Sequence, residues 1–182
     1  MKYFYDTEFH ENGHYIDLIS IGIIAEDGRE YYAINASAQW RTINQHPWLS
    51  ENVVPHLPEP SSPEWKMKWQ IRDEVAAFLA GDDSAQLWAW YSAYDHVALA
   101  QLFGTMMDLP QGVPMYTNDV RSLVDFTGIT ELPKQGGTAH DALDDARHVK
   151  AMHDHIVRAL TAREFGVVAP IRTYLGVEKS HD

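Results

Sequence analysis

The first part of the chain carries the hydrophobic patterns of β-strands. Lys2–Phe9 is expected to be a strand in which every second side chain falls on one face. Tyr15–Glu26 is almost continuously apolar, which is typical of a strand buried on both faces. Glu30–Asn35 is a third candidate strand, and an Asn-Gly and an Asp-Gly pair mark turns between the three segments. The pattern predicts an antiparallel meander.

The next stretch changes character. Ala36–Pro60 contains four prolines and is expected to be irregular. Ser61–Glu64 combines a hydroxyl cap, a proline in the first turn and an acid three residues after the cap, which predicts a helix start. The apolar spacing continues this helix to about Leu79, and Gly81 ends it.

Strands and helices alternate in the rest of the chain. The expected elements are a strand over Gln86–Tyr91, a helix over 95–103, a short strand near Met115, a helix over 119–126 and a long helix from Asp141 to about Arg163. Three antiparallel strands followed by α/β crossovers are the element order of a ribonuclease-H-like fold. We therefore expect an α/β protein with a mixed sheet flanked by helices. Residues 1–182 are expected to form one domain with 166–182 as a C-terminal tail, whose Ile171–Val177 segment docks on the body.

Three carboxylates are expected at one edge of this sheet. In the ribonuclease-H-like arrangement the first and fourth strands lie side by side and parallel, so their carboxyl ends meet. Asp6 and Glu8 share a face at the end of the first strand, and Asp95 follows the fourth.

The last helix adds a fourth carboxylate and a histidine. Its apolar stripe consists of Ala142, Ala146, Val149, Met152, Ile156 and Leu160. At about 100° per residue, Asp145 lies about 45° from the centre of this stripe and Asp144 about 145° from it. We therefore expect Asp145 to face inward and Asp144 to face solvent. His140 immediately precedes the first turn and is expected at the same edge.

Composition and charge narrow the function. The chain is 45% hydrophobic and has no cysteine, which excludes disulfides and thiolate metal sites. No signal peptide or membrane-spanning stretch is visible, so a cytoplasmic location is expected. The net charge of −12 disfavours a protein that coats duplex nucleic acid. It is compatible with an enzyme that grips a strand end and whose acids hold divalent cations.

Clustered Asp and Glu side chains are suited to hard cations. Mg²⁺ or Mn²⁺ prefers oxygen ligands, and two such ions about 3.5–4 Å apart support phosphodiester cleavage. A nearby histidine can accept the proton of the attacking water near neutral pH.

These motifs together resemble the DEDDh family of 3′–5′ exonucleases. Asp6-x-Glu8 matches the first motif, Asp95 the second, and His140-x-x-x-x-Asp145 the third. The likeness is greatest to the small mycobacterial-type bacterial exoribonucleases, through Tyr-Phe-Tyr-Asp-Thr-Glu-Phe, Leu-Ile-Ser-Ile-Gly, Leu-Trp-Ala-Trp and Ala-Tyr-Asp-His-Val-Ala-Leu.

The resemblance implies specific roles. Asp6, Glu8, Asp95 and Asp145 would hold two Mg²⁺ or Mn²⁺ ions, and His140 would be the general base. The substrate would be the 3′ end of single-stranded RNA, and the product a nucleoside 5′-monophosphate. A homodimer is common in the wider family. The preference for RNA over DNA rests on the subfamily likeness alone, so a DNA-directed exonuclease is the first alternative.

Two departures from the family pattern concern the grip on the terminal nucleotide. Phe9-His10-Glu11 replaces the Thr-Thr-Gly common after the first motif, and Tyr91 replaces an asparagine. We assign Thr7, Phe9 and Tyr91 as candidate substrate-binding residues, because Phe9 and Tyr91 flank the acids and offer stacking surfaces.

Other interpretations remain open from the sequence. Asp95 is also a plausible helix N-cap. A non-catalytic nucleic-acid-binding module would have the same fold, and a haloacid-dehalogenase-type phosphatase would begin with a similar strand but with Asp in place of Glu8. The tryptophans at 65, 69, 88 and 90 are expected in the core, and the histidines at 148, 153 and 155 on the solvated surface.

Overall fold

The computed structural model describes residues 1–81 and 84–164. The segment Ile171–Val177, predicted to dock on the body, and the rest of the predicted tail lie outside these residues. No helix within the described part of the chain has the length and apolar character needed to cross a membrane.

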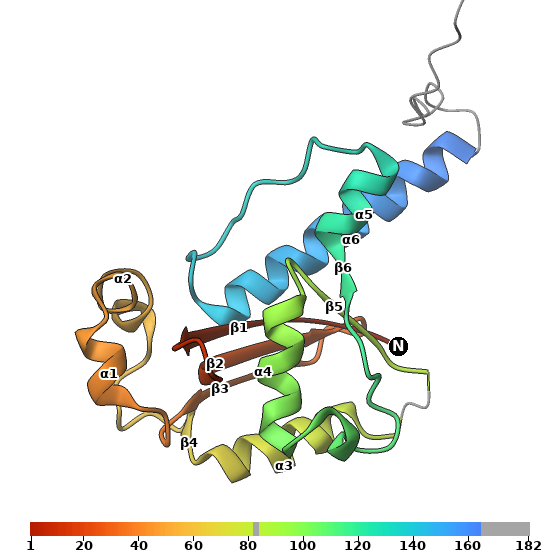
Figure 1. Ribbon diagram of the computed structural model, residues 1–182. Coiled ribbons are helices and arrows are strands. Elements are labelled where there is room, and N and C mark those ends of the chain that lie inside the picture. The colour runs from red at the N-terminus through yellow and green to blue at the C-terminus, as the bar shows by residue number, and fades with distance from the viewer. Residues whose placement is uncertain (82–83, 165–182) are drawn as a thin grey trace, which may run out of the picture.

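One mixed sheet forms the centre of the described structure (Figure 1). Its six strands are ordered β4-β3-β2-β1-β5-β6. They are β1 (Lys2–Glu11), β2 (Ile16–Ala25), β3 (Glu30–Asn35), β4 (Trp65–Lys66), β5 (Gln86–Ala89) and β6 (Asn118–Asp119). The predicted antiparallel meander is confirmed, because β1 pairs with β2 and β2 with β3 in antiparallel register. The predicted parallel pairing of the first and fourth main strands is also confirmed, as β1 with β5.

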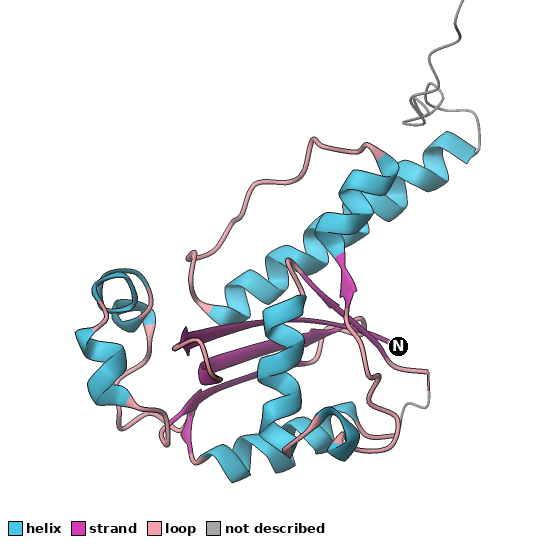
Figure 2. Ribbon diagram, viewed as in Figure 1, coloured by secondary structure: helices cyan, strands magenta, loops and turns pink. Residues whose placement is uncertain are grey.

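Helices cover both faces of the sheet, as Figure 2 shows. They include α3 (Lys68–Leu79), α4 (Ala93–Phe103), α5 (Val120–Thr127) and α6 (Ala142–Glu164), with a short 3₁₀ turn, η2 (Met106–Asp108), after α4. The ends follow the predicted signals: Gly104 ends α4, and Gly128, in a left-handed conformation, ends α5.

Alternating side chains of β1 divide the core into two halves. Tyr3 and Tyr5 pack with residues of α3 and α4 on one face of the sheet. Phe4 points the other way and packs with Val149 and Ile156 of α6. Asp6 and Glu8 continue the face of Phe4, so the strand's period of two directs both acids toward α6.

The prediction of irregular chain over Ala36–Pro60 is wrong. This stretch forms α1 (Trp40–Gln45), α2 (Pro47–Asn52) and the 3₁₀ turn η1 (Val54–His56). Pro47 is the first residue of α2, a position where the missing N–H costs nothing, and the His46 side chain accepts a hydrogen bond from the Leu49 amide (3.3 Å). The proline therefore starts a helix here.

The predicted helix start at Ser61 is also wrong. The Ser62 hydroxyl bonds to the Glu64 carboxylate within a local turn, and the chain then forms β4. The amides of Ile34 and Ala36 donate to the carbonyls of Glu64 and Lys66, each at 2.8 Å, which adds β4 to the edge of β3. The helix α3 begins only at Lys68 and ends at Leu79 as predicted.

Gly22 allows α6 to approach the sheet closely. It lies on β2 opposite Asp6 of β1. A Cβ atom at Gly22 would lie 2.3 Å from the Ala142 carbonyl oxygen and 2.4 Å from the Leu143 Cα. Because only a residue without a side chain fits there, the first turn of α6 is placed directly against the strand pair that carries the acids.

Some expectations about single side chains are corrected. Trp69 is 58% exposed, so it is not a core residue. His153 is buried, not solvated: its ring lies between Phe4 and Trp88, with centroids 4.9 and 4.6 Å away, and its Nδ1 lies 3.1 Å from Asp154 Oδ1. The aromatic neighbours and the adjacent carboxylate together accommodate a histidine ring in the interior.

Candidate active site

Asp6 and Glu8 lie in the middle of β1 and not at its end as predicted, because the strand continues to Glu11. The register between β1 and β2 shifts between Glu8 and Phe9, which marks a bulge directly after the second acid. Glu8 is buried and Asp6 partly buried. Strand geometry therefore presents two neighbouring carboxylates on the face covered by α6.

Asp95 is placed by Thr7, the residue between these two acids. Both the Thr7 amide (2.9 Å) and the Thr7 hydroxyl (2.7 Å) donate to Asp95 Oδ1. Asp95 lies in the first turn of α4, whose N-cap is Ser92, so the alternative of Asp95 as a plain N-cap is not what the structure shows. Neither of these two bonds involves the second carboxylate oxygen, Asp95 Oδ2.

The loop before α6 places the last two candidates. Asp141 Oδ1 accepts from the amides of Leu143 and Asp144, each at 3.0 Å, and so caps the helix. Asp145 follows in the first turn, where its Oδ2 accepts from the His140 amide (2.9 Å) and its Oδ1 bonds to the Gln135 side chain. His140 Nδ1 in turn lies 3.7 Å from Glu8 Oε1.

All five residues predicted for the chemistry line one cavity of about 590 Å³. The lining residues are Asp6, Thr7, Glu8, Phe9, Trp90, Tyr91, Tyr94, Asp95, Leu132, Gln135, His140, Asp145, His148, Val149 and Met152. The cavity lies beyond the carboxyl end of β5, as predicted, and beside residues 6–9 within β1. Asp6 and Asp145, which are more than 130 residues apart in the sequence, thus line the same cavity.

Burial raises the pKa values of the four carboxylates, and for Asp6 and Glu8 the charges of other site acids add to the shift. Burial, with the charges of Asp95 and Glu8, raises the pKa of Asp6 well above its usual range. Burial, with the charges of Asp145 and Asp95, raises the pKa of Glu8 to about 8. Burial raises the pKa of Asp95 to about 6 although its bonds from Thr7 oppose the shift. The pKa of Asp145 is raised by burial too.

This donor set fits divalent cations. Among the described residues, the cavity lining contains no lysine or arginine that would neutralise the acids. Glu8, His140 and Asp145 each offer a ligand atom, and these atoms lie within 4.8 Å of one another. Carboxylates that repel each other when ionised are stabilised by hard cations with oxygen preference, such as Mg²⁺ or Mn²⁺.

His140 has an unusual backbone and an unforeseen neighbour. Its φ is 65°, in the left-handed region that residues with a side chain rarely adopt. Its ring meets the edge of Trp48 from α2, with centroids 4.9 Å apart and planes at 80°. Trp48 was missed by sequence reasoning because its segment was expected to be irregular.

The three candidate substrate-binding residues differ in availability. Thr7 is buried and both its donors are directed at Asp95, so its visible role is to hold that acid. The Phe9 ring stacks on Tyr94, with centroids 5.5 Å apart and planes at 3°. Tyr91 is 62% exposed and, like His140, has a positive φ (57°). All three line the cavity, and their contact with substrate stays a prediction.

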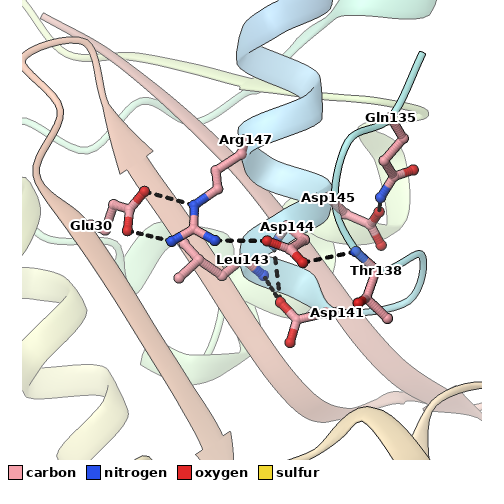
Figure 3. Close-up of polar contacts among 8 residues, drawn as sticks. All are labelled: Glu30, Gln135, Thr138, Asp141, Leu143, Asp144, Asp145 and Arg147. Atoms are coloured by element: carbon pink, nitrogen blue, oxygen red, sulfur yellow. Dashed lines mark hydrogen bonds and ion pairs between the residues drawn. The ribbon is translucent and has the colours of Figure 1, made fainter.

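Asp144 and Asp145 point in different directions, as the helical phase predicts, but the expectation that Asp144 faces solvent is wrong. Its Oδ2 accepts from the Thr138 amide (2.8 Å), and its Oδ1 accepts from Arg147 (2.7 Å). Figure 3 shows Asp144 between these two partners while Asp145 reaches Gln135. His148, expected on the solvated surface, lies in the cavity wall one turn further along α6.

Gln135 and Tyr94 were also missed as cavity residues. Helical spacing offered one usable signal: Tyr94 directly precedes Asp95 in the first turn of a helix that starts at the site. Gln135 sits in a glycine-containing loop, where no period relates a side chain to a surface.

The chain matches the family model of the Rv2179c-like 3′–5′ exoribonuclease domain over residues 1–157. It belongs to this family. The five site residues lie within the matched part of the chain. Two similar relatives are the 3′–5′ exoribonuclease Rv2179c of Mycobacterium tuberculosis strain H37Rv and the 3′–5′ exoribonuclease MT2234.1 of strain CDC 1551. Each is 50% identical over 149 residues, which cover 81% of this chain and 88% of the relative.

A solved structure supports the fold of this Rv2179c-like chain. It is similar to the zinc-bound complex of Escherichia coli ExoI with single-stranded DNA, with a TM-score of 0.60 and 11% sequence identity. The likeness covers 91% of this chain and 42% of that chain. At this identity the comparison supports the shared exonuclease fold alone, which agrees with the predicted ribonuclease-H-like architecture.

Proposed function

We propose that this chain is a metal-dependent 3′–5′ exoribonuclease that releases nucleoside 5′-monophosphates from single-stranded RNA. The observation that carries the proposal is the convergence of four carboxylates and His140 in a cavity whose lining, among the described residues, holds no lysine or arginine. Family membership supports the reaction class. The raised pKa values of the carboxylates support the need for bound cations.

Asp6, Glu8, Asp95 and Asp145 would hold two Mg²⁺ or Mn²⁺ ions. When bound, such ions supply charge neutralisation at the phosphate and activation of the attacking water. Thr7 contributes by fixing Asp95 Oδ1 with two hydrogen bonds, which do not engage Oδ2. Gln135 and the His140 amide orient Asp145 by bonds to its two carboxylate oxygens, Oδ1 and Oδ2 respectively.

His140 would accept the proton of the attacking water. Its ring is partly exposed at the cavity wall, with a side-chain exposure of 42% against 10% for Glu8. It is therefore within reach of solvent and of a substrate, and a general base needs access to both. The ring contact with Trp48 limits the orientations open to the imidazole.

Substrate preference follows from the shape and charge of the molecule. The acidic surface, with a net charge of −12, offers little attraction for two phosphate strands, and a cavity of about 590 Å³ suits one terminal nucleotide. Phe9 and Tyr91 would stack on unpaired bases. A cytoplasmic location and a homodimer complete the proposal. The oligomer is measurable by light scattering on the purified chain.

The test uses one strand as RNA and as DNA, labelled at the 5′ or the 3′ end and incubated with Mg²⁺ or Mn²⁺. The expected result is immediate release of a labelled mononucleotide from the 3′-labelled RNA and stepwise shortening of the 5′-labelled RNA. Asp6→Asn, Asp95→Asn and excess chelator should each abolish this, while Asp125→Asn, an exposed acid on α5, should not. Cleavage that survives in Asp95→Asn or in chelator contradicts the metal mechanism. Equal rates on DNA remove the RNA preference, and binding without cleavage favours a non-catalytic module.

A further inference from the structure

A chain of charged groups connects the far side of α6 to the loop that carries His140. Arg147 Nε and Nη2 donate to the two carboxylate oxygens of Glu30 on β3 at 2.8 and 2.7 Å. Arg147 Nη1 donates to Asp144 Oδ1 at 2.7 Å. Asp144 Oδ2 accepts from the Thr138 amide at 2.8 Å. Figure 3 shows these groups in sequence from the sheet, across the helix, to the loop.

The same loop is attached to the site at its other end. Two residues after Thr138, the His140 amide donates to Asp145, which lines the cavity. The neighbouring acids Asp144 and Asp145 thus each accept a hydrogen bond from a backbone amide of this loop. With two backbone amides held within three residues, the conformation of the short segment that ends in His140 is constrained.

Gly137 lies against the Asp144 side chain and leaves room for it. A Cβ atom at Gly137 would lie 2.5 Å from Asp144 Cγ and Oδ2, closer than such atoms approach in proteins. At the adjacent Gly136, a Cβ atom would meet nothing within 4 Å. Neither glycine has a positive φ, so the requirement at Gly137 is for space around the carboxylate and not for a special backbone conformation.

Stability alone does not account for these contacts. The side chains of Arg147, Glu30 and Asp144 are 46%, 34% and 24% exposed. Ion pairs at such exposure contribute little to the free energy of folding. The bidentate arginine geometry instead gives a defined direction to the groups it joins. We therefore expect the main effect of these contacts to be on the position of the loop and not on the free energy of folding.

We propose that Glu30, Arg147 and Asp144 are positioning residues that hold Thr138, and through it the His140 loop, in the geometry required for the reaction. This inference rests on the proposed function, because it assigns His140 as the group that is positioned. Arg147 orients Asp144, Glu30 orients Arg147, and Asp144 fixes the loop by its bond to the Thr138 amide. None of the three lines the cavity.

The first experiment measures the chemical step. Asp144→Ala and Glu30→Gln should lower the single-turnover rate at saturating RNA by about tenfold to a hundredfold, because small displacements of a reacting group have effects of that size. RNA affinity, measured in Ca²⁺ or on a non-cleavable strand, should stay near that of the wild type. Asp125→Ala breaks an exposed ion pair on α5 and is the matched control.

The glycine pair tests the same idea without removing a charge. Gly137→Ala should displace the Asp144 carboxylate and reproduce the rate loss, while Gly136→Ala should keep the wild-type rate. This comparison also answers the case in which Asp144→Ala fails to fold. Wild-type rates in both Gly137→Ala and Glu30→Gln would overturn the proposal.

A double-mutant cycle separates positioning from general destabilisation. If Asp144 acts through His140, Asp144→Ala should cause no further loss in a His140→Ala background. Equal losses in both backgrounds would overturn the proposal in favour of a structural role. Hydrogen exchange provides a readout independent of activity: the Thr138 amide should be protected in the wild type and exposed in Asp144→Ala. If His140→Ala itself keeps the wild-type rate, the proposed base is wrong, and protection of the Thr138 amide still reports on the loop contact.

Discussion

Two residues beside the cavity hold backbone conformations that only glycine adopts easily. Tyr91 and His140 have φ values of 57° and 65°. Such conformations cost about 1–3 kcal/mol for a residue with a side chain, and they persist where the surrounding structure enforces them. Here both outliers lie in the wall of the candidate site. Backbone strain is expected at such a site when it holds a side chain in the position that the function needs.

The Tyr91 side chain is expected to lower the stability of the fold and to strengthen the binding of substrate. Tyr91→Asn should raise the free energy of unfolding by about 1 kcal/mol, because asparagine tolerates the left-handed region better. The same change should weaken binding of single-stranded RNA by about 1–3 kcal/mol if the ring stacks on a base. Urea unfolding and RNA titration with a non-cleavable strand measure the two effects.

Tyr116 provides the matched control for both effects. Its side chain is 64% exposed, against 62% for Tyr91, but its φ is not positive and it does not line the cavity. Tyr116→Asn should change neither quantity appreciably. A Tyr91→Asn variant with unchanged RNA affinity would show that the exposed ring does not contact substrate.

His140 should affect the rate far more than binding. His140→Ala and His140→Asn should each lower the single-turnover rate by about 10²–10⁴-fold while RNA binding is retained. The asparagine variant tolerates the positive φ, so it separates loss of the proton acceptor from a change of loop conformation. His56→Ala, an exposed histidine of η1, is the control. A wild-type rate in folded His140→Asn would exclude the role as general base.

At the scale of elements, the sequence predicted best where the signal is local. Hydrophobic period and turn residues placed β1, β2 and β3, and cap residues placed the ends of α4 and α5. The stretch before β4 was misjudged because a proline is read as a breaker, although Pro47 occupies the one helical position it favours. β4 is two residues long and exists through its pairing with β3, which no local pattern records.

Within the candidate site too, residues placed by a local pattern were predicted and residues placed by tertiary packing were not. Asp6, Glu8, Asp95 and Asp145 were predictable because strand period, sheet topology and helical phase each point to one edge. Trp48 and Gln135 were not, because their positions depend on how a helical segment and a loop pack in three dimensions. Asp144 was assigned the right direction but the wrong surroundings, since helical phase says nothing of the loop that crosses it.

The close contact between α6 and the sheet gives a prediction at this scale. Gly22→Ala should destabilise the fold by about 1–3 kcal/mol or more, because the added Cβ meets backbone atoms at 2.3–2.4 Å and backbone cannot rotate away. Any variant that folds should lose activity, since the shift moves the turn that carries Asp145. Urea unfolding and RNA cleavage are the measurements. Gly136→Ala, in open space, should alter neither, and a Gly22→Ala protein of wild-type stability would contradict the packing described.

At the scale of the whole molecule, the acidic site opposes folding when no cation is bound. The chain carries 26 acidic against 14 basic residues, and its buried acids lie together at one sheet edge. Burial, with the charges of Asp145 and Asp95, raises the pKa of Glu8 to about 8, and burial raises the pKa of Asp95 to about 6. In the unfolded chain both groups ionise near their ordinary values of 4.5 and 3.8.

The sign of the pH dependence follows from proton binding. Between the unfolded and folded pKa values, the folded state holds protons that the unfolded state has lost, so its stability falls as pH rises. The contribution is fully present below about pH 4 and is lost as pH rises through about 6 for Asp95 and about 8 for Glu8. Without cations, the free energy of unfolding should therefore decrease by a few kcal/mol between about pH 5 and pH 8.

Urea unfolding in chelator across this pH range measures the effect, and Glu8→Gln tests its source. The variant should flatten the upper part of the dependence, while Glu51→Gln, an exposed acid of α2, should leave it unchanged. Mg²⁺ or Mn²⁺ should stabilise the wild type more at pH 8 than at pH 6, because cations compete with protons for the same carboxylates. A metal-free protein whose stability rises from pH 5 to 8 would show that the acids are not held in mutual repulsion, and the case for a cation site would lose its electrostatic basis.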